Sequence, residues 1–291
     1  MKTAWVFPGQ GSQVLNMGVD LQDISTAQAK FKQAEELLGW SVLEISQGDE
    51  EKLSRTLYTQ PSLFVIEAIL ADLLLENGHY PDLVTGHSLG EYSALYTTRV
   101  FDFPTGLKLV KVRAELMDTV QGGKMVALMK FDRRVLEQTL ARFPDLVLAN
   151  DNSEQQVVIS GTPEVVDQAL TEIQAKRAIP LKVSGAFHSP LMAEVSQKFQ
   201  TVLETVTFEN PKVPVLSNID PSPCTDGNQL RERLSQQMTG SVRWREIMLS
   251  FPQEQVDLAI EVGPGNVLTG LIKRTCPNIA LKNVQTFADI Y

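Results

Sequence analysis

The stretch that most constrains this chain is Leu83-Val84-Thr85-Gly86-His87-Ser88-Leu89-Gly90-Glu91. A short apolar run leads into Gly-His-Ser-Leu-Gly, and Tyr92 to Leu95 then predict the first turns of a helix. This is a G-x-S-x-G nucleophile elbow in the strand–turn–helix context that the motif requires. The glycines are needed because the turn is too tight for side chains beside the serine. The sequence therefore predicts an activated Ser88, without saying which reaction it serves.

Composition limits the remaining possibilities. The 291 residues are 43% hydrophobic and 21% charged, which is typical of a soluble globular chain. The net charge of −9 argues against a nucleic-acid partner and gives no sign of membrane binding. No apolar run reaches the roughly 18 residues of a membrane span, and no signal peptide is expected because the N-terminus leads directly into a strand. Cys224 and Cys276 stand alone, so we expect a reducing, cytoplasmic environment and no disulfide framework. A monomer is expected as well.

Most of the chain alternates helices with short apolar strands, which predicts an α/β fold with a largely parallel sheet. The expected strands are 3–7, 82–85, 213–217 and 257–262. The expected helices are 25–38, 60–76, 104–120, 190–206, 228–238, 243–250 and one after residue 266. Gly39 should end the first helix, and Pro61 should lie in the first turn of the second.

Residues 125–187 have a different pattern. The expected strands are 125–128, 145–149, 156–160 and 179–183, with helices at 133–142 and 163–176. This double β-α-β order is ferredoxin-like. We therefore expect a small subdomain, 125–187, inserted into a core formed by residues 1–124 and 188–291.

The loop Pro8-Gly9-Gln10-Gly11-Ser12-Gln13 follows the first strand. It lacks the third glycine of a dinucleotide loop, where Val14 stands, and the Lys-Ser/Thr of a phosphate loop. One interpretation is a tight turn after an edge strand. The other is a loop whose backbone N–H groups approach a ligand closely.

Arg113 is the most informative charged residue. On a helical wheel it falls in the middle of the apolar face of helix 104–120. A buried arginine keeps its proton and needs an anionic partner or a strong acceptor. That partner is either a buried Asp or Glu of the chain or an anion that belongs to a substrate.

His188 is the candidate base for Ser88 by elimination. The chain has three histidines. His87 should point away from its neighbour on the tight turn, and His79 lies in a polar loop. His188 precedes Ser189 and Pro190, which can cap and open a helix whose positive end favours neutral imidazole. The alternative is a loop histidine with a structural hydrogen bond.

Six segments together resemble the malonyl-coenzyme A:acyl carrier protein transacylases of type II fatty acid synthesis. They are Phe7–Gln13, Thr59–Pro61, Gly86–Ser93, Arg113–Met117, Gly185–Met192 and Glu261–Gly265. The match spans nearly the whole chain. It implies an α/β-hydrolase-like core with a largely parallel sheet and an inserted ferredoxin-like subdomain.

The resemblance implies a role for each site residue. Ser88 corresponds to the nucleophile, His188 to its base and Arg113 to the partner of the malonyl carboxylate. The other expected site residues are the oxyanion-hole N–H groups of Gln10 and Leu89, substrate-binding Gln60 and Phe187, and histidine-orienting Gln237. Phe187 should crowd an α-methyl branch. A backbone carbonyl at Gln237 would explain why no carboxylate stands out as a third catalytic member.

The implied reaction moves malonyl from malonyl-CoA to the phosphopantetheine thiol of acyl carrier protein through an ester on Ser88. No permanently bound cofactor and no metal are expected. The alternatives are a polyketide-type acyltransferase for another extender unit, a serine thioesterase or hydrolase, and a non-catalytic coenzyme A or carrier-binding module. Lys176, Arg177 and Lys182, or Lys273 and Arg274, are candidate docking charges for an acidic carrier, although solvated surface charge is the more common explanation for any one of them. Arg99, Asp151 and Arg243 depart from the family pattern.

Overall fold

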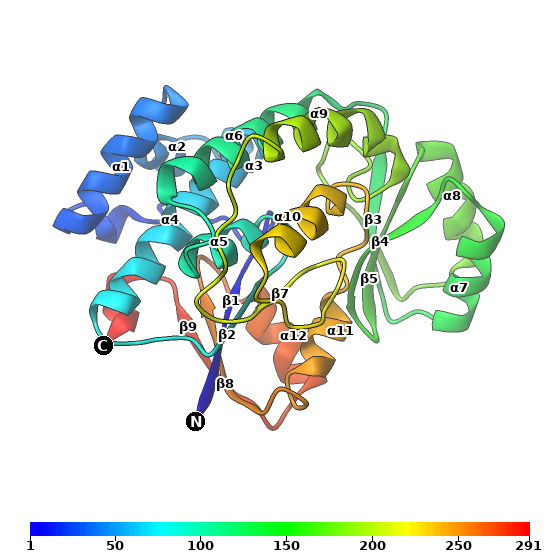
Figure 1. The fold of residues 1–291 in the computed structure, drawn as a ribbon. Helices are drawn as coiled ribbons and strands as arrows, with labels where there is room; N and C mark the ends of the chain where they lie inside the picture. The colour runs from blue at the N-terminus through cyan, green and yellow to red at the C-terminus, as the bar shows by residue number, and fades with distance from the viewer.

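The computed structural model, which describes residues 1–291, is built around a five-stranded parallel sheet (Figure 1). Its strand order is β7-β2-β1-β8-β9. The strands are β1 (Lys2–Phe7), β2 (Leu83–Gly86), β7 (Val215–Leu216), β8 (Val256–Val262) and β9 (Ala280–Val284). β1 pairs in parallel with both β2 and β8, so it is the central strand. The edge-strand interpretation of the loop after β1 is therefore wrong.

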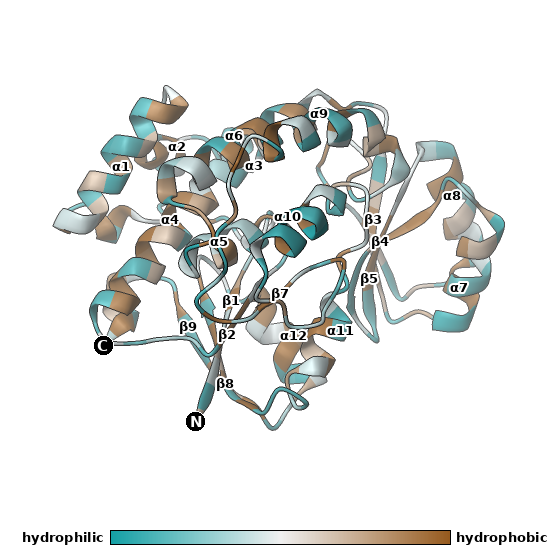
Figure 2. Cartoon of the chain, in the orientation of Figure 1, coloured by the Kyte–Doolittle hydropathy of each residue, from teal (hydrophilic) through white to brown (hydrophobic).

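Helices cover both faces of this sheet because β1 is apolar on both sides. Trp5 and Phe7 face the layer that contains α4 (Thr56–Glu76), α5 (Gly90–Thr97) and α6 (Phe103–Thr119). Ala4 and Val6 face α11 (Trp244–Ser250) and α12 (Val267–Thr275). The remaining core helices are α1 (Ser25–Leu38), α2 (Val42–Gln47), α3 (Glu50–Ser54), α9 (Ala193–Leu203) and α10 (Gly227–Gln236). Figure 2 shows α10 mostly in the hydrophilic colour, as expected for a helix with one face in solvent.

A second sheet forms the small subdomain, drawn in green in Figure 1. It is antiparallel, with the order β4-β5-β3-β6. Its elements are β3 (Lys124–Met129), α7 (Arg133–Arg142), β4 (Val147–Ser153), β5 (Gln156–Gly161), α8 (Pro163–Glu172) and β6 (Arg177–Pro180). Asp132 and Thr162 cap the two helices with their side-chain oxygens. This is the expected double β-α-β order, and the fold class predicted from the sequence is confirmed.

The subdomain is joined to the core through β4. Asp151 N–H donates to Val242 O at 2.9 Å, and Val242 N–H donates to Ala149 O at 2.8 Å. The Asp151 carboxylate, which is 5% exposed, also pairs with Arg133 of α7 and Arg245 of α11. Asp151 therefore has a structural explanation: it links a subdomain helix to a core helix.

Several element boundaries differ from the sequence prediction. α1 and its C-cap, Gly39 at φ 83°, are as expected. α4 begins at Thr56, so Pro61 lies inside the helix and not in its first turn. β4 begins two residues later than predicted and α8 ends four residues earlier. The sequence analysis did not identify β9, α2 or α3, which are short and have no strong apolar periodicity.

α4 also differs from the expectation that no stretch could span a membrane. By length and composition alone it is apolar enough to do so. However, 89% of its most apolar window is buried inside the protein. Its hydrophobicity is thus explained by its place in the core between α1, α5 and α6.

Candidate active site

The elbow has the geometry that its sequence predicts. Ser88 lies between β2 and α5 with φ 51°, in the left-handed region. A Cβ on Gly86 would lie 1.9 Å from the Gly90 carbonyl carbon, and one on Gly90 would lie 2.0 Å from Phe7 O. Both positions therefore require glycine, and the strained backbone directs Ser88 away from the sheet.

His188 meets Ser88 from the segment that returns the chain from the subdomain. Its Nε2 lies 2.9 Å from Ser88 Oγ. Its Nδ1 lies 2.9 Å from Gln237 O and 3.1 Å from Gly240 O. Since carbonyl oxygens only accept, Nδ1 carries the proton and Nε2 can accept from the serine hydroxyl. Gln237, the C-cap residue of α10, thus lies where the resemblance implies an orienting carbonyl.

His188 is held in the neutral, basic form. Burial, together with the nearby positive charge of Arg113, lowers its pKa to about 3. The expected cause, a helix N-terminus directly after Ser189, is not the main one. Only a short 3-10 helix, Pro190–Met192, follows, and α9 begins at Ala193.

The other two histidines lie as expected. His87 points away from Ser88, and its Nε2 is 2.8 Å from Asn152 Oδ1 of β4. His79 is exposed. His188 is therefore the histidine that contacts the nucleophile.

The side chain of Arg113 extends from α6 to Ser88. It is 0% exposed, and no carboxylate lies within 4.0 Å of its guanidinium. Its Nη1 donates to Gln60 Oε1 at 2.6 Å, and its Nη2 donates to Ser88 Oγ and to Gln237 Oε1, both at 3.0 Å. The interpretation of Arg113 as half of a structural ion pair is wrong. A buried cation therefore lies beside Ser88, bonded only to neutral groups.

The two expected oxyanion donors belong to segments that adjoin the elbow. Leu89 opens α5, and Gln10 lies in the loop after β1. That loop packs tightly on the elbow, because a Cβ on Gly9 would lie 2.4 Å from His87 O. Neither the Gln10 nor the Leu89 backbone N–H donates a hydrogen bond within the protein. Both groups are free to bind an anionic oxygen.

The two expected substrate-binding side chains differ in position. Gln60 is 1% exposed on α4, where it holds Arg113. Phe187 is 5% exposed and adjoins His188 in sequence. Its ring lies close to Gly185, where a Cβ would be 3.1 Å away.

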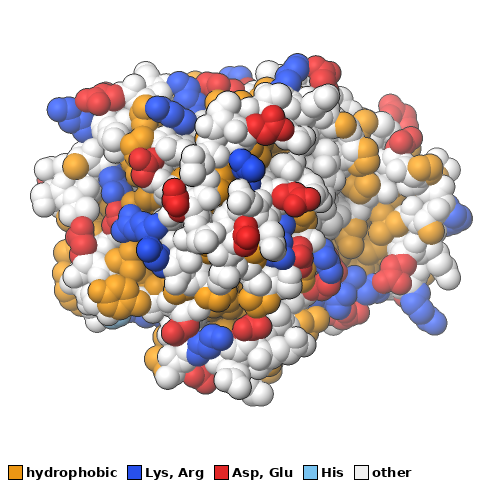
Figure 3. All heavy atoms as spheres, viewed as in Figure 1, with side chains coloured by type: hydrophobic (Ala, Val, Ile, Leu, Met, Phe, Trp, Pro, Cys, Tyr) orange, Lys and Arg blue, Asp and Glu red, His pale blue; other side chains and the backbone are white.

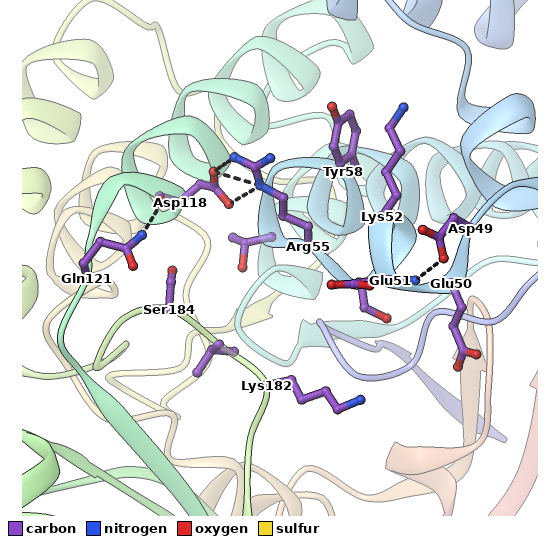
Figure 4. A pocket seen from close by; sticks show the side chains of 13 residues that line it. Asp49, Glu50, Glu51, Lys52, Arg55, Tyr58, Asp118, Gln121, Lys182 and Ser184 are labelled. Carbon is purple, nitrogen blue, oxygen red and sulfur yellow. Dashed lines mark hydrogen bonds and ion pairs between the residues drawn. The ribbon is translucent and has the colours of Figure 1, made fainter.

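A hollow of about 1180 Å³ lies around the start of α4 (Figure 4), and none of Ser88, His188 and Arg113 lines it. It is lined by residues of α3, the start of α4, the end of α6 and residues 182–184. Thr56 belongs to its lining and accepts a hydrogen bond from Gln10 Nε2 at 3.1 Å. Figure 4 shows Arg55 and Asp118 paired at its wall, at 2.6 Å. The hollow therefore ends next to the oxyanion loop.

The sequence analysis missed two residues that hold the elbow. Asn218 Oδ1 accepts from Ser88 N–H at 2.7 Å, and Asn218 Nδ2 donates to Gly86 O at 2.6 Å. Glu91 Oε2 accepts from Gln237 Nε2 at 2.7 Å and from Asn218 N–H at 3.2 Å. The position of Asn218, shortly after a strand of the parallel sheet, was an available signal, because functional groups gather at that edge. Glu91 lies inside the elbow motif and was given no role.

No group of three or more His, Cys, Asp or Glu side chains could hold a metal ion. The candidate docking residues Lys176, Arg177, Lys182, Lys273 and Arg274 are all exposed and form no ion pair. Among them, Lys182 lines the hollow, as Thr56 does.

An α/β fold with an elbow serine bonded to a neutral histidine defines the class of enzymes that work through an ester on serine. The model of the acyl transferase domain family matches residues 4–288. The chain belongs to that family.

Two relatives and two solved structures refine this assignment. The chain is 59% identical over 290 residues to the malonyl CoA-acyl carrier protein transacylase of Synechocystis sp., covering 100% of this chain and 99% of the relative. The crystal structure of a Synechocystis malonyl-CoA:ACP transacylase superposes with a TM-score of 0.98, with the same identity and coverage. A polyketide biosynthesis malonyl CoA-acyl carrier protein transacylase of Bacillus subtilis is 38% identical, covering 93% of this chain and 96% of the relative. The chain also matches a structure of a type II polyketide acyl carrier protein in complex with its malonyl-transacylase. The TM-score is 0.95 at 35% identity, and the match covers 100% of this chain and 98% of the matched chain.

Proposed function

We propose that the protein is an acyl carrier protein S-malonyltransferase, which moves malonyl from malonyl-CoA to the phosphopantetheine thiol of acyl carrier protein. The observation that carries this proposal is the buried guanidinium of Arg113, which lies 3.0 Å from Ser88 Oγ and has no carboxylate partner in the chain. An acyl group that ends in a carboxylate supplies the missing charge where the serine attacks. The 59% identity to a malonyl CoA-acyl carrier protein transacylase supports the same substrates.

The first half of the reaction forms the ester. Ser88 Oγ attacks the thioester carbon while His188 Nε2 takes its proton, and the C–S bond breaks as that proton passes to the sulfur of coenzyme A. The backbone N–H groups of Gln10 and Leu89 stabilise the tetrahedral oxyanion, which is typically worth about 3 kcal/mol per donor. In the second half, the carrier thiol attacks the malonyl ester and Ser88 recovers its proton.

Arg113 supplies the selectivity. A bidentate pair with the distal carboxylate favours malonyl, whereas acetyl would leave a buried cation without an anionic partner. Gln60 fixes the guanidinium, and Phe187 narrows the space beside the base, which disfavours an α-methyl branch. The serine hydrolase alternative leaves Arg113 without a purpose.

We assign the chemistry to the core, residues 1–124 and 188–291, with residues 125–187 as the inserted subdomain. The higher identity to the Synechocystis relative than to the polyketide relative supports fatty acid synthesis as the pathway. We propose a cytoplasmic monomer without a resident cofactor.

The carrier is proposed to dock beside Lys182, near Lys176 and Arg177. Lys182 lines the hollow whose wall at Thr56 contacts the Gln10 side chain, so the phosphopantetheine arm is proposed to enter there and to reach Ser88 past Gln10. On the face shown in Figure 3, acidic and basic side chains are interspersed. Docking is therefore expected to depend on a few local cations and not on a broad positive surface.

The test is intact-protein mass spectrometry after mixing with malonyl-CoA in the absence of carrier. We expect one malonyl adduct on Ser88 that is absent from Ser88→Ala. An unmodified wild-type protein would contradict the mechanism. Arg113→Ala should lower the preference for malonyl over acetyl by about 100-fold or more, because the carboxylate loses its partner. If malonyl selectivity survives in that variant, the role given to Arg113 is wrong.

A further inference from the structure

Arg113 contacts the attacking oxygen itself, and this contact has a consequence for how the serine is activated. Both hydrogens of Nη2 are in use, one on Ser88 Oγ and one on Gln237 Oε1, each at 3.0 Å. Nη1 donates to Gln60 Oε1, and Nε has no partner. The nucleophile thus accepts a hydrogen bond from the cation that we propose recognises the substrate.

A carboxylate cannot bind this guanidinium with two hydrogen bonds without displacing an existing partner. The planar group offers two forks to a carboxylate: Nε with Nη2, and Nη1 with Nη2. Both forks include Nη2, and neither of its hydrogens is free. Either Ser88 Oγ or Gln237 Oε1 must therefore give way.

Ser88 is the partner that can move. The amide of Gln237 is 0% exposed, and its Nε2 donates to Ser88 O at 2.9 Å and to Glu91 Oε2 at 2.7 Å. Moving its Oε1 would break these buried bonds. Ser88 Oγ is on a short, partly exposed side chain and keeps His188 Nε2 as a partner at 2.9 Å.

We propose that Arg113 restrains Ser88, and that a carboxylate on the acyl group releases it. The inference rests on the proposed malonyl transfer and deepens it: the acid group triggers the nucleophile as well as anchoring the substrate. An oxygen that accepts a hydrogen bond from a cation is a poorer nucleophile, because the bond stabilises its lone pair. Once released, Oγ forms the bond to the thioester carbon and gives its proton to His188. An acetyl group has no carboxylate, so the hydrogen bond from Arg113 to Ser88 Oγ persists.

The test supplies the carboxylate and the acyl group as two separate molecules. Acetyl-CoA delivers the acyl group, and sodium formate, the smallest carboxylate, is added separately. The acetylation rate of Ser88 is followed by intact-protein mass, with sodium chloride at equal ionic strength as the control. We expect formate to raise the rate by about tenfold or more, since a hydrogen bond from a charged donor to Oγ is lost.

Two variants locate the effect. Arg113→Ala should acetylate faster than wild type without formate and should not respond to formate. Lys108→Ala removes an exposed cation from the same helix, α6, and should behave as wild type. If Arg113→Ala does not fold, the formate titration of the wild type decides alone.

The proposal is overturned if formate leaves the rate of wild-type acetylation unchanged or lowers it. So does an equal acceleration in Arg113→Ala, because the carboxylate would then act elsewhere. Malonylation of Ser88 by malonyl-CoA is measured in parallel. Its success together with a negative formate result rejects the restraint alone, whereas its failure rejects the malonyltransferase function.

Discussion

Replacing Asn218 by alanine should both destabilise the protein and disturb the elbow. Its carboxamide bonds Ser88 N–H at 2.7 Å and Gly86 O at 2.6 Å, and the side chain is 0% exposed. Alanine leaves both backbone groups buried without a partner. At about 1–3 kcal/mol for each unsatisfied group, the free energy of unfolding should fall by about 2–6 kcal/mol.

The same change should reduce catalysis in the molecules that remain folded. The left-handed conformation of Ser88 costs about 1–2 kcal/mol and persists only while neighbours impose it. Without the two hydrogen bonds made by Asn218, the backbone of Ser88 can relax, and a displacement of its side chain by about 1 Å costs about 100-fold in rate. We therefore expect kcat/KM for malonyl transfer to fall by about that factor.

The assay pairs urea unfolding with malonyl-transfer kinetics at a temperature where each variant is folded. Asn210→Ala is the matched control, because Asn210 Oδ1 also accepts a backbone N–H, that of Gly227 at 2.9 Å, on an exposed loop. It should lose about 1 kcal/mol of stability and no activity. A folded Asn218→Ala protein with kcat/KM within a few-fold of wild type would refute the reasoning.

Three further changes have defined outcomes. Folded His188 has a pKa of about 3, whereas the histidine of the unfolded chain has its ordinary pKa, so the protein loses stability as the pH falls below neutral. Between about pH 7 and 5, the free energy of unfolding of wild type, measured in urea, should fall by about 2 kcal/mol more than that of His188→Gln. Parallel loss in both proteins would contradict this. Gly9→Ala places a Cβ 2.4 Å from a backbone oxygen, so it should lower the free energy of unfolding by about 1–3 kcal/mol and reduce kcat. In Gly270→Ala, the nearest atom to the new Cβ is 3.9 Å away, so the free energy of unfolding should rise by about 0.5–1 kcal/mol. Equal stability of the two variants would argue against the close approach at Gly9. Arg99→Gly relieves a φ of 66° and loses a 3.7 Å pair with Asp72 and a cation–π contact with Tyr96 at 5.7 Å. Because the strain outweighs these exposed contacts, urea unfolding should show a gain of about 0.5 kcal/mol with unchanged activity. A clear loss of stability would mean that the contacts outweigh the strain.

Local sequence was enough to predict most elements and several site residues. The elbow, the helix that carries Arg113 and the double β-α-β order were all visible, because strand and helix periodicities and turn glycines act over a few residues. Where local signals are weak, the prediction was incomplete. β9 was missed because its sequence, Ala-Leu-Lys-Asn-Val, has no continuous apolar run, and the start of α4 was misplaced because Pro61 is usually found near a helix start.

By itself, the sequence determined that Ser88 sits on an elbow, that Arg113 lies on an apolar helix face, and that His188 is the histidine left to serve as the base. Only the tertiary structure decided what Arg113 contacts, and it replaced an expected ion pair with neutral partners and the nucleophile. It also brought in Asn218, 130 residues from Ser88, and made Gln237 bind His188 with its backbone and Arg113 with its side chain. The physical reason is that parallel strands distant in sequence end at one edge of the sheet. Contacts made there depend on strand order, which no local pattern encodes.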